Sequence, residues 1–206
     1  ISVCAIDSEL GTIQPIDKII EIKKKYPDCR LHVDATQAIG RIPFSFDGID
    51  TMSLAPHKFG GLNGSGILLK REGVAMEPLL NGGASTTIYR SGTPALAMAV
   101  TSALALEMAL AQEDEVNARI SEYNHMLRKE LSAYSRVQIN SPKHSVPHIL
   151  NLSVEGIKGT EFQKALTERE VCVSVKSACS VENTPSRSVF AISRDRKRAL
   201  SSWRIS

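Results

Sequence analysis

Short apolar segments alternate with a helical segment near the start of the chain, and this alternation constrains the fold more than any other feature. We expect strands at four short apolar runs: 1–6, 31–34, 52–54 and 67–69. Pro15 is suited to open a helix, and isoleucines then recur at helical spacing as far as Tyr26 and Pro27. Short strands that alternate with helices are typical of an α/β sheet with helices on both faces.

The pattern changes after Pro94. The segment 95–111 is rich in Ala, Leu and Met and is apolar almost all round, so we expect a well-buried helix there. A more polar helix should follow, ending near Leu131. Beyond it we expect strands at 137–139, 149–153 and 171–174, and helices at 161–167 and 194–200. The sequence therefore predicts an α/β part over 1–110 and a smaller α+β domain over 111–206.

The two ends of the chain both read as strands without flanking sequence. Ile1 begins an apolar run with no lead-in, and Ser206 ends one that is cut short. The first residues have no basic region and no small-residue cleavage site, so they do not resemble a signal peptide. We therefore expect this sequence to be part of a longer protein.

Charge and hydropathy argue against two classes of function. The formal net charge of +3 is too small to indicate a nucleic-acid-binding surface, and no apolar run approaches the roughly 20 residues that cross a bilayer. The basic run 194–198 is expected to be a solvated face, with contact to an acidic protein as the alternative. We predict a protein that binds neither nucleic acid nor membrane.

The cysteines favour a reducing compartment. The four are Cys4, Cys29, Cys172 and Cys179, and no two of them form a CxxC pair. No His lies at metal-ligand spacing beside them, so neither a zinc site nor a disulfide framework is expected. We predict a cytoplasmic protein with one reactive thiol among inert ones, and we interpret Cys172, within an apolar segment, as an ordinary buried cysteine.

Two predicted strands end at residues that can carry chemistry. Asp34 directly follows one apolar strand, and Gln37 lies three residues further on. Lys58 follows the next strand, beside His57 and before two glycines, where desolvation would lower the pKa of its amine and permit Schiff-base formation. The alternatives are a capping or turn carboxylate for Asp34 and an exposed loop amine for Lys58.

A third polar segment lies directly before the long apolar helix. Residues 89–94 are basic and hydroxyl-bearing, and Thr93 could help to bind an anion at the start of that helix. Simple capping of the helix by Thr93 explains the same residues. Ligands in open α/β sheets bind at the carboxyl ends of strands, so the three segments are candidates for one site.

The motifs, taken in order, resemble the class V aminotransferase family of pyridoxal-phosphate (PLP) enzymes, and within it the NifS/IscS-like cysteine desulfurases. The motifs that carry the resemblance are ELGTIQP at 9–15, HVDATQ at 32–37, PHKFGG at 56–61, GSG at 64–66, RSGT at 90–93 and VSVKSACS at 173–180. The resemblance covers essentially the whole chain. It implies fold type I, the aspartate-aminotransferase-like fold, with part of a large mixed-sheet domain and a smaller C-terminal domain.

The resemblance also implies a role for each candidate residue. Lys58 would hold PLP covalently, and Asp34 would pair with the pyridinium nitrogen. Gln37 would donate to the phenolic oxygen, and His57 would lie near the phosphate. Thr93 would reach the phosphate bound by the other subunit, which implies a homodimer.

By the same resemblance, the substrate is L-cysteine and Cys179 takes its sulfur as a persulfide, with release of alanine. The sulfur would pass to an iron–sulfur scaffold or to another acceptor for thio-cofactors or tRNA. Two alternatives stay open: another class V enzyme, such as a selenocysteine lyase or an aminotransferase, and a non-catalytic scaffold for sulfur transfer.

Some residues depart from the family pattern. Ser8 stands where the family usually has an asparagine near the substrate, and Ala55 where a serine normally binds the phosphate. Lys176 replaces a glycine in the cysteine loop, and 85–88 replaces a stretch that usually carries more charge. These changes suggest a divergent branch of the family.

Overall fold

The computed structural model describes residues 1–83, 87–175 and 185–206, and these fall into two units. One unit consists of Ile1–Ala5 and Pro15–Gln112, and the other of Ile6–Gln14 and Glu113–Ser206. The second unit thus includes a short segment from near the start of the chain, which the boundary drawn after residue 110 did not anticipate. The interpretation of these units as the large PLP-binding domain and the small domain stays a prediction.

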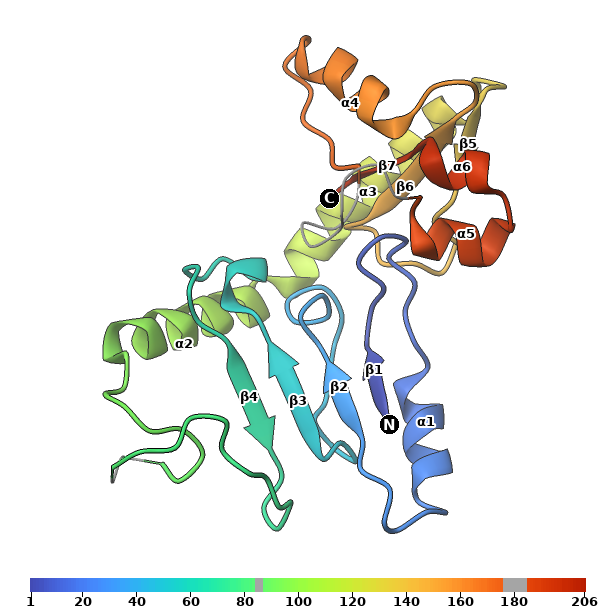
Figure 1. The fold of residues 1–206 in the computed structure, drawn as a ribbon. Helices are drawn as coiled ribbons and strands as arrows, with labels where there is room; N and C mark the ends of the chain where they lie inside the picture. Colours follow the sequence, from blue (N-terminus) through green and yellow to red (C-terminus); the bar gives the residue numbers. More distant parts are fainter. Residues whose placement is uncertain (84–86, 176–184) are drawn as a thin grey trace. The chain divides into compact units, whose positions relative to one another are not determined.

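The first unit contains a four-stranded mixed sheet in the order β1-β2-β3-β4 (Figure 1). Its strands are β1 (Ser2–Cys4), β2 (His32–Asp34), β3 (Thr51–Leu54) and β4 (Ile67–Lys70). The first three are parallel, and β4 pairs with β3 in the antiparallel direction, with Leu54 opposite Ile67. The four expected strands are therefore confirmed.

Local chemistry explains these elements. In β3 the side chains of Met52 and Leu54 are buried, and the alternating residues Thr51 and Ser53 are half-buried. This is the period-two pattern of a strand. Helix α1 (Ile16–Lys23) begins directly after Pro15, as expected, and Ile16 is its buried residue. Leu31 and Val33, both fully buried, bring β2 into the centre of the sheet.

A buried ion pair ties α1 to the start of β3. The Lys23 Nζ lies 2.6 Å from Asp50 Oδ2, and the two side chains are 16% and 6% exposed. The backbone N–H of Leu31 donates to the same carboxylate at 2.7 Å. Burial alone would raise the pKa of Asp50, but the hydrogen bonds from Lys23 and Leu31 and the charges of Lys23 and Arg30 outweigh it, and the pKa is lowered.

We expect the stabilising effect of Asp50 to depend on pH in the acid range. A carboxyl whose pKa is lower in the folded than in the unfolded state stabilises the fold above its unfolded pKa of about 4. That contribution is lost as the pH falls through the folded pKa. Asp50→Asn should therefore be less stable than the wild type at pH 7, with a gap in urea midpoint, followed by circular dichroism, that narrows below about pH 4. The exposed Asp17→Asn is the control; an unchanged gap for Asp50→Asn down to low pH would contradict the assignment.

Helix α2 (Leu96–Ala111) has the expected position but not the expected burial. Only Ser102 and Ala105 are buried, whereas Leu96, Val100 and Leu104 are each more than half exposed. The prediction of a well-buried helix is wrong for this chain, because its apolar residues have too few partners within the unit. Among the described residues no single helix is long and apolar enough to cross a membrane, although α2 taken together with the helix that follows it passes the same test.

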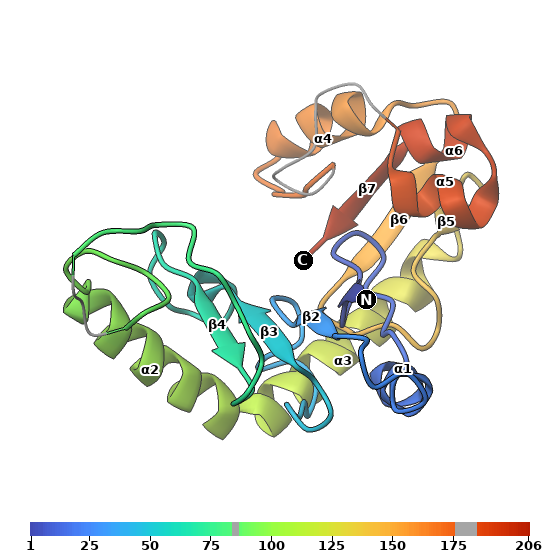
Figure 2. The same ribbon diagram turned by 60° about the horizontal axis from the view of Figure 1, so that its bottom comes forward.

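The second unit contains a three-stranded antiparallel sheet in the order β5-β6-β7. Its elements are α3 (Glu113–Leu131), β5 (Val137–Ile139), β6 (Leu150–Val154), α4 (Gly159–Thr167), α5 (Arg187–Ser193), α6 (Arg196–Leu200) and β7 (Ser202–Ile205). Leu150, Leu152, Val154 and Trp203 form its core, and the ring of Phe162 from α4 lies 4.9 Å from that of Trp203. Figure 2 shows α5 and α6 side by side next to this sheet.

Two expectations about the segment 171–174 are wrong. The segment 171–174 is not a strand: it makes a single bridge, between Ser174 and Arg204 of β7, and Cys172 is exposed rather than buried. The expected helix at 194–200 is confirmed as α6, which begins at Arg196. A separate helix that was not expected, α5, precedes it and ends where Arg194 adopts a left-handed conformation with φ of 55°. Asp195 then caps α6 by accepting from the N–H groups of Lys197 and Arg198.

Candidate active site

The carboxyl ends of the parallel strands bring three of the predicted residues to one edge of the first sheet. Asp34 is the last residue of β2, and it lies opposite Ser53 of β3. Gln37 lies in the turn that follows β2, and Lys58 lies in the short 3-10 helix η1 (Pro56–Lys58) that follows β3. Both connections lie at the same end of the sheet in Figure 1. The structure therefore groups Asp34, Gln37 and Lys58, as the sequence predicts for a single site.

Asp34 presents one carboxylate oxygen to the site. Its Oδ1 accepts from the backbone N–H of Thr36 at 2.9 Å, which is a turn contact of the kind proposed as the alternative. Its Oδ2 makes no hydrogen bond within the described ranges, and the side chain is half-buried. Asp34 thus closes a turn with one oxygen and keeps the other available for a cationic group.

Lys58 is held by a compact turn. Its backbone N–H donates to the carbonyl of Ala55 at 2.9 Å, and the N–H of Gly61 donates to the carbonyl of Pro56 at 2.8 Å. A Cβ on Gly61 would lie 2.7 Å from the Cβ of Pro56, so the second glycine of the motif is required for close approach. Lys58 is half-buried, and its amine has no hydrogen-bond or ion-pair partner in the described part of the chain.

His57 and Thr93 contribute less to this geometry. Both are exposed, and no contact of either side chain with Asp34 or Lys58 is present. Thr93 does not cap α2, because the cap is Ala95 and no side chain bonds there, so the capping alternative is wrong. Ala55 is extended and offers only its backbone to the turn. The roles of His57 and Thr93 stay predictions.

The second unit contains a polar network that was not expected from the sequence. The carboxylate of Asp7 accepts from the hydroxyl of Ser188, and that of Glu9 accepts from the hydroxyl of Ser186. Arg204, 8% exposed, donates to the carbonyl of Ser8, the residue noted above as a departure from the family. Burial lowers the pKa of Arg204, while the nearby acidic groups of Glu9 and Asp7 oppose that shift. Only the loop motif at 9–15 hinted at this network, because its partners lie far along the chain.

Cys179 and Lys176 lie outside the described residues. The described residues on either side are anchored within the second unit. Ser174 and Arg204 exchange two backbone hydrogen bonds, at 2.9 and 2.7 Å. Ser186 receives a backbone hydrogen bond at its hydroxyl from Val189 and thereby caps α5. The role of Cys179 stays a prediction.

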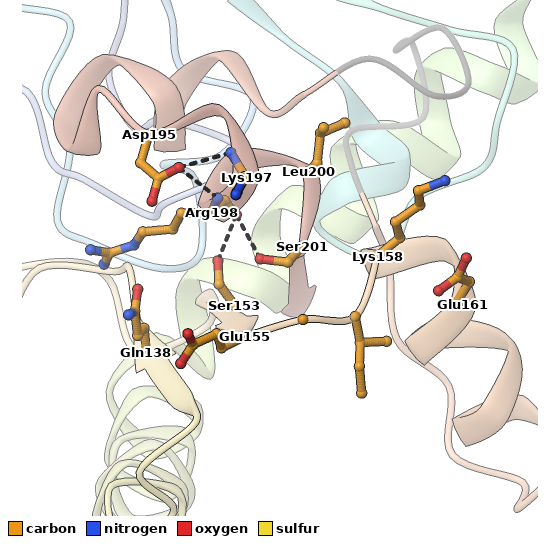
Figure 3. A pocket seen from close by; sticks show the side chains of 12 residues that line it. Gln138, Ser153, Glu155, Lys158, Glu161, Asp195, Lys197, Arg198, Leu200 and Ser201 are labelled. Carbon is orange, nitrogen blue, oxygen red and sulfur yellow. Dashed lines mark hydrogen bonds between the residues drawn. The ribbon is translucent and has the colours of Figure 1, made fainter.

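A cavity of about 440 Å³ lies in the second unit and shares no residue with the predicted site (Figure 3). Its walls carry charges of both signs, among them Glu155, Lys158 and Lys197. The hydroxyls of Ser153 and Ser201, which line the cavity, both donate to the carbonyl of Arg198, so these polar groups already have hydrogen-bond partners. In the described ranges, no three His, Cys, Asp or Glu side chains are placed to hold a metal ion.

The residues grouped around Lys58 fit the ring of PLP by the chemistry of their donors and acceptors. A free amine suits the aldehyde carbon, a free carboxylate oxygen suits the protonated ring nitrogen, and a free amide N–H suits the phenolic oxygen. These three groups come from Lys58, Asp34 and Gln37, and each is half-buried. The fit to the phosphate group of PLP is less well supported, because Ala55 has no hydroxyl with which to bind it.

Comparison with known proteins agrees with this chemistry. The chain matches the family model for aminotransferase class-V over residues 1–206. It is 36% identical over 185 residues to a NifS/IcsS protein homolog of Lactobacillus delbrueckii subsp. bulgaricus, covering 87% of this chain and 48% of that protein. It is 34% identical over 197 residues to the cysteine desulfurase IscS of Dictyoglomus turgidum, covering 93% of this chain and 50% of the relative.

The chain is also similar to a solved structure of a NifS-like protein, with a TM-score of 0.89 and 34% identity. The match covers 100% of this chain and 54% of the NifS-like chain. The chain spans about half the length of the curated relatives it matches. Its architecture is that of fold type I, with a mixed sheet in the first unit and an α+β second unit. The chain belongs to the class V aminotransferase family, whose members use PLP, and it is similar to the cysteine desulfurases within it.

Proposed function

We propose that the protein is a PLP-dependent cysteine desulfurase that converts L-cysteine to L-alanine and takes the sulfur on Cys179. The observation that carries this proposal is the convergence of Asp34, Gln37 and Lys58 at the carboxyl edge of one sheet. The similarity to named cysteine desulfurases supports the choice of reaction within the family.

Each residue of the group has a defined task in this reaction. The Lys58 amine would hold the cofactor covalently and, once freed, would move the α-proton of the substrate. The Asp34 Oδ2 would keep the ring nitrogen protonated. PLP supplies an electron sink for the carbon skeleton of the substrate. His57 and Thr93 would contact the phosphate, Thr93 from the other subunit of a homodimer.

Sulfur transfer is the step assigned to Cys179. Its thiolate forms an S–S bond with the substrate sulfur as the bond between that sulfur and the substrate β-carbon breaks. The electron pair of the broken bond stays with the β-carbon, which is then protonated, and the product leaves as alanine. The persulfide on Cys179 is the form in which sulfur would pass to an iron–sulfur scaffold or another acceptor protein. A cytoplasmic location stays a prediction.

Alanine formation from L-cysteine tests this proposal in the full-length protein loaded with PLP. We expect Cys179→Ala to lower alanine formation by roughly 10²-fold or more, since the nucleophile is lost, while the visible band of the bound cofactor still responds to L-cysteine. Cys172→Ala is the matched control and should retain turnover, because Cys172 is exposed but lies in none of the family's functional motifs.

The other outcomes separate the alternatives. Undiminished turnover in Cys179→Ala would point to a selenocysteine lyase or another class V enzyme, since those chemistries need no cysteine nucleophile. A wild-type protein without a cofactor band would support the non-catalytic scaffold.

A further inference from the structure

The turn after β2 places an arginine directly against Gln37. The N–H groups of Ala38 and Ile39 donate to the carbonyl of Ala35, and the N–H groups of Arg41 and Ile42 donate to the carbonyl of Ala38. These are consecutive turns, with Gly40 in a left-handed conformation at φ of 71°, and they bring the side chain of Arg41 back to that of Gln37. Ala38 and Ile39 are buried and anchor the turn, whereas Gln37 and Arg41 are half-buried.

The contact between them is short and has one chemical interpretation. Arg41 Nη1 lies 2.6 Å from Gln37 Oε1. A guanidinium group has only donors, so the atom that faces it must be the amide oxygen and not the amide nitrogen. The Gln37 Nε2 is then left with two N–H groups, and it makes no hydrogen bond within the described ranges.

We propose that Arg41 is a positioning residue that fixes the Gln37 amide so that it presents only a donor to the ligand at Lys58 and Asp34. This inference rests on the proposed function, in which that ligand is PLP and the group facing Gln37 is its phenolic oxygen. A terminal amide without a partner rotates over two nearly equal orientations, and one of them would place oxygen against oxygen. The Arg41 hydrogen bond removes that orientation, and its charge polarises the amide and strengthens the remaining donor.

The test is a pH titration of the visible band in the PLP-loaded full-length protein. A donor on the phenolic oxygen withdraws electron density, so its loss makes the proton held beside that oxygen harder to remove. We expect Arg41→Met, which keeps length but cannot donate, to raise the apparent pKa of the band by about one unit. Arg41→Lys, which can still donate to Oε1, should restore most of the wild-type value.

A double-mutant cycle separates positioning from a general charge effect. In a Gln37→Ala background, Arg41→Met should produce no further shift, because the two residues act through one hydrogen bond. The exposed Arg119→Met is the control for loss of one positive charge and should leave the band unchanged. An equal shift from Arg41→Met in both backgrounds, or no shift in the wild-type background, overturns the inference.

A second measurement does not depend on the cofactor. The side-chain N–H signals of Gln37, identified by their loss in Gln37→Ala, should report a rigid amide in the unloaded wild type and a mobile one in Arg41→Met. Unchanged signals in Arg41→Met overturn the positioning role. The two proposals can fail separately. If the wild type shows no visible band that depends on Lys58, the proposed function is wrong. If the Gln37 signals nevertheless behave as expected, the positioning role of Arg41 still holds.

Discussion

Replacing Lys58 by alanine is expected to lower turnover of L-cysteine by at least about 10³-fold and to abolish the visible band of bound PLP. The structure gives the reason: the Lys58 amine is half-buried, has no partner in the described ranges, and lies at the strand edge that also carries Asp34. It is the group of this site that can both bind the cofactor covalently and carry a proton.

Two variants sharpen the test of Lys58. Lys58→Arg keeps a positive charge but cannot act as a neutral amine, so it should be as inactive as the alanine variant. An added small primary amine should restore part of the activity of Lys58→Ala but none of that of Lys58→Arg. The exposed Lys18→Ala in α1 is the matched control and should be unaffected. Activity retained in Lys58→Arg would contradict the covalent role.

The second large effect is on stability. Leu152 is fully buried in the central strand β6, with Ile139 opposite it on β5 and Trp203 opposite it on β7. Truncation removes apolar surface and leaves a cavity that strands on both sides prevent from collapsing. We expect Leu152→Ala to lower the free energy of unfolding of the second unit by about 3 kcal/mol.

Trp203 provides the signal for this measurement. It is the single tryptophan of the chain and is 5% exposed beside Leu152, so its fluorescence in urea reports on this core. Met126→Ala in α3 removes a comparable apolar group from a side chain that is 54% exposed, and it should change stability by less than about 0.5 kcal/mol. A loss below about 1 kcal/mol for Leu152→Ala would mean that this core repacks around the deletion.

The strands of the first unit were predictable because their patterns are local. Apolar runs of three or four residues, each followed by a polar residue, are sufficient to place β2 and β3 and to predict that Asp34 and Lys58 share an edge. The burial of α2 was not predictable in the same way. An apolar helix indicates that something covers it, but Leu96 and Val100 are each more than half exposed to solvent among the described residues.

Residues that depend on contacts across the sequence were missed. Helix α5 was not expected, and it ends at the left-handed residue Arg194, a conformation for which no side-chain pattern marks an arginine. The apolar residues around Cys172 favoured a strand. However, β7 pairs with β6 along its length and forms a bridge with this segment only at Ser174. The contact of Arg41 with Gln37 was not predictable from spacing, because it depends on consecutive turns in which Gly40 is left-handed.

The excursion of Ile6–Gln14 into the second unit makes that unit discontinuous in sequence. Glu9 receives hydrogen bonds from Asn151 and Ser186, which are 142 and 177 residues away, and Ser8 receives one from Arg204, 196 residues away. During synthesis these contacts can therefore form only after residues much further along the chain have been made, the last of them Arg204. Such long loop closures carry a large entropic cost and slow folding. A piece containing only residues 113–206 would leave the Arg204 guanidinium buried without its carbonyl acceptor.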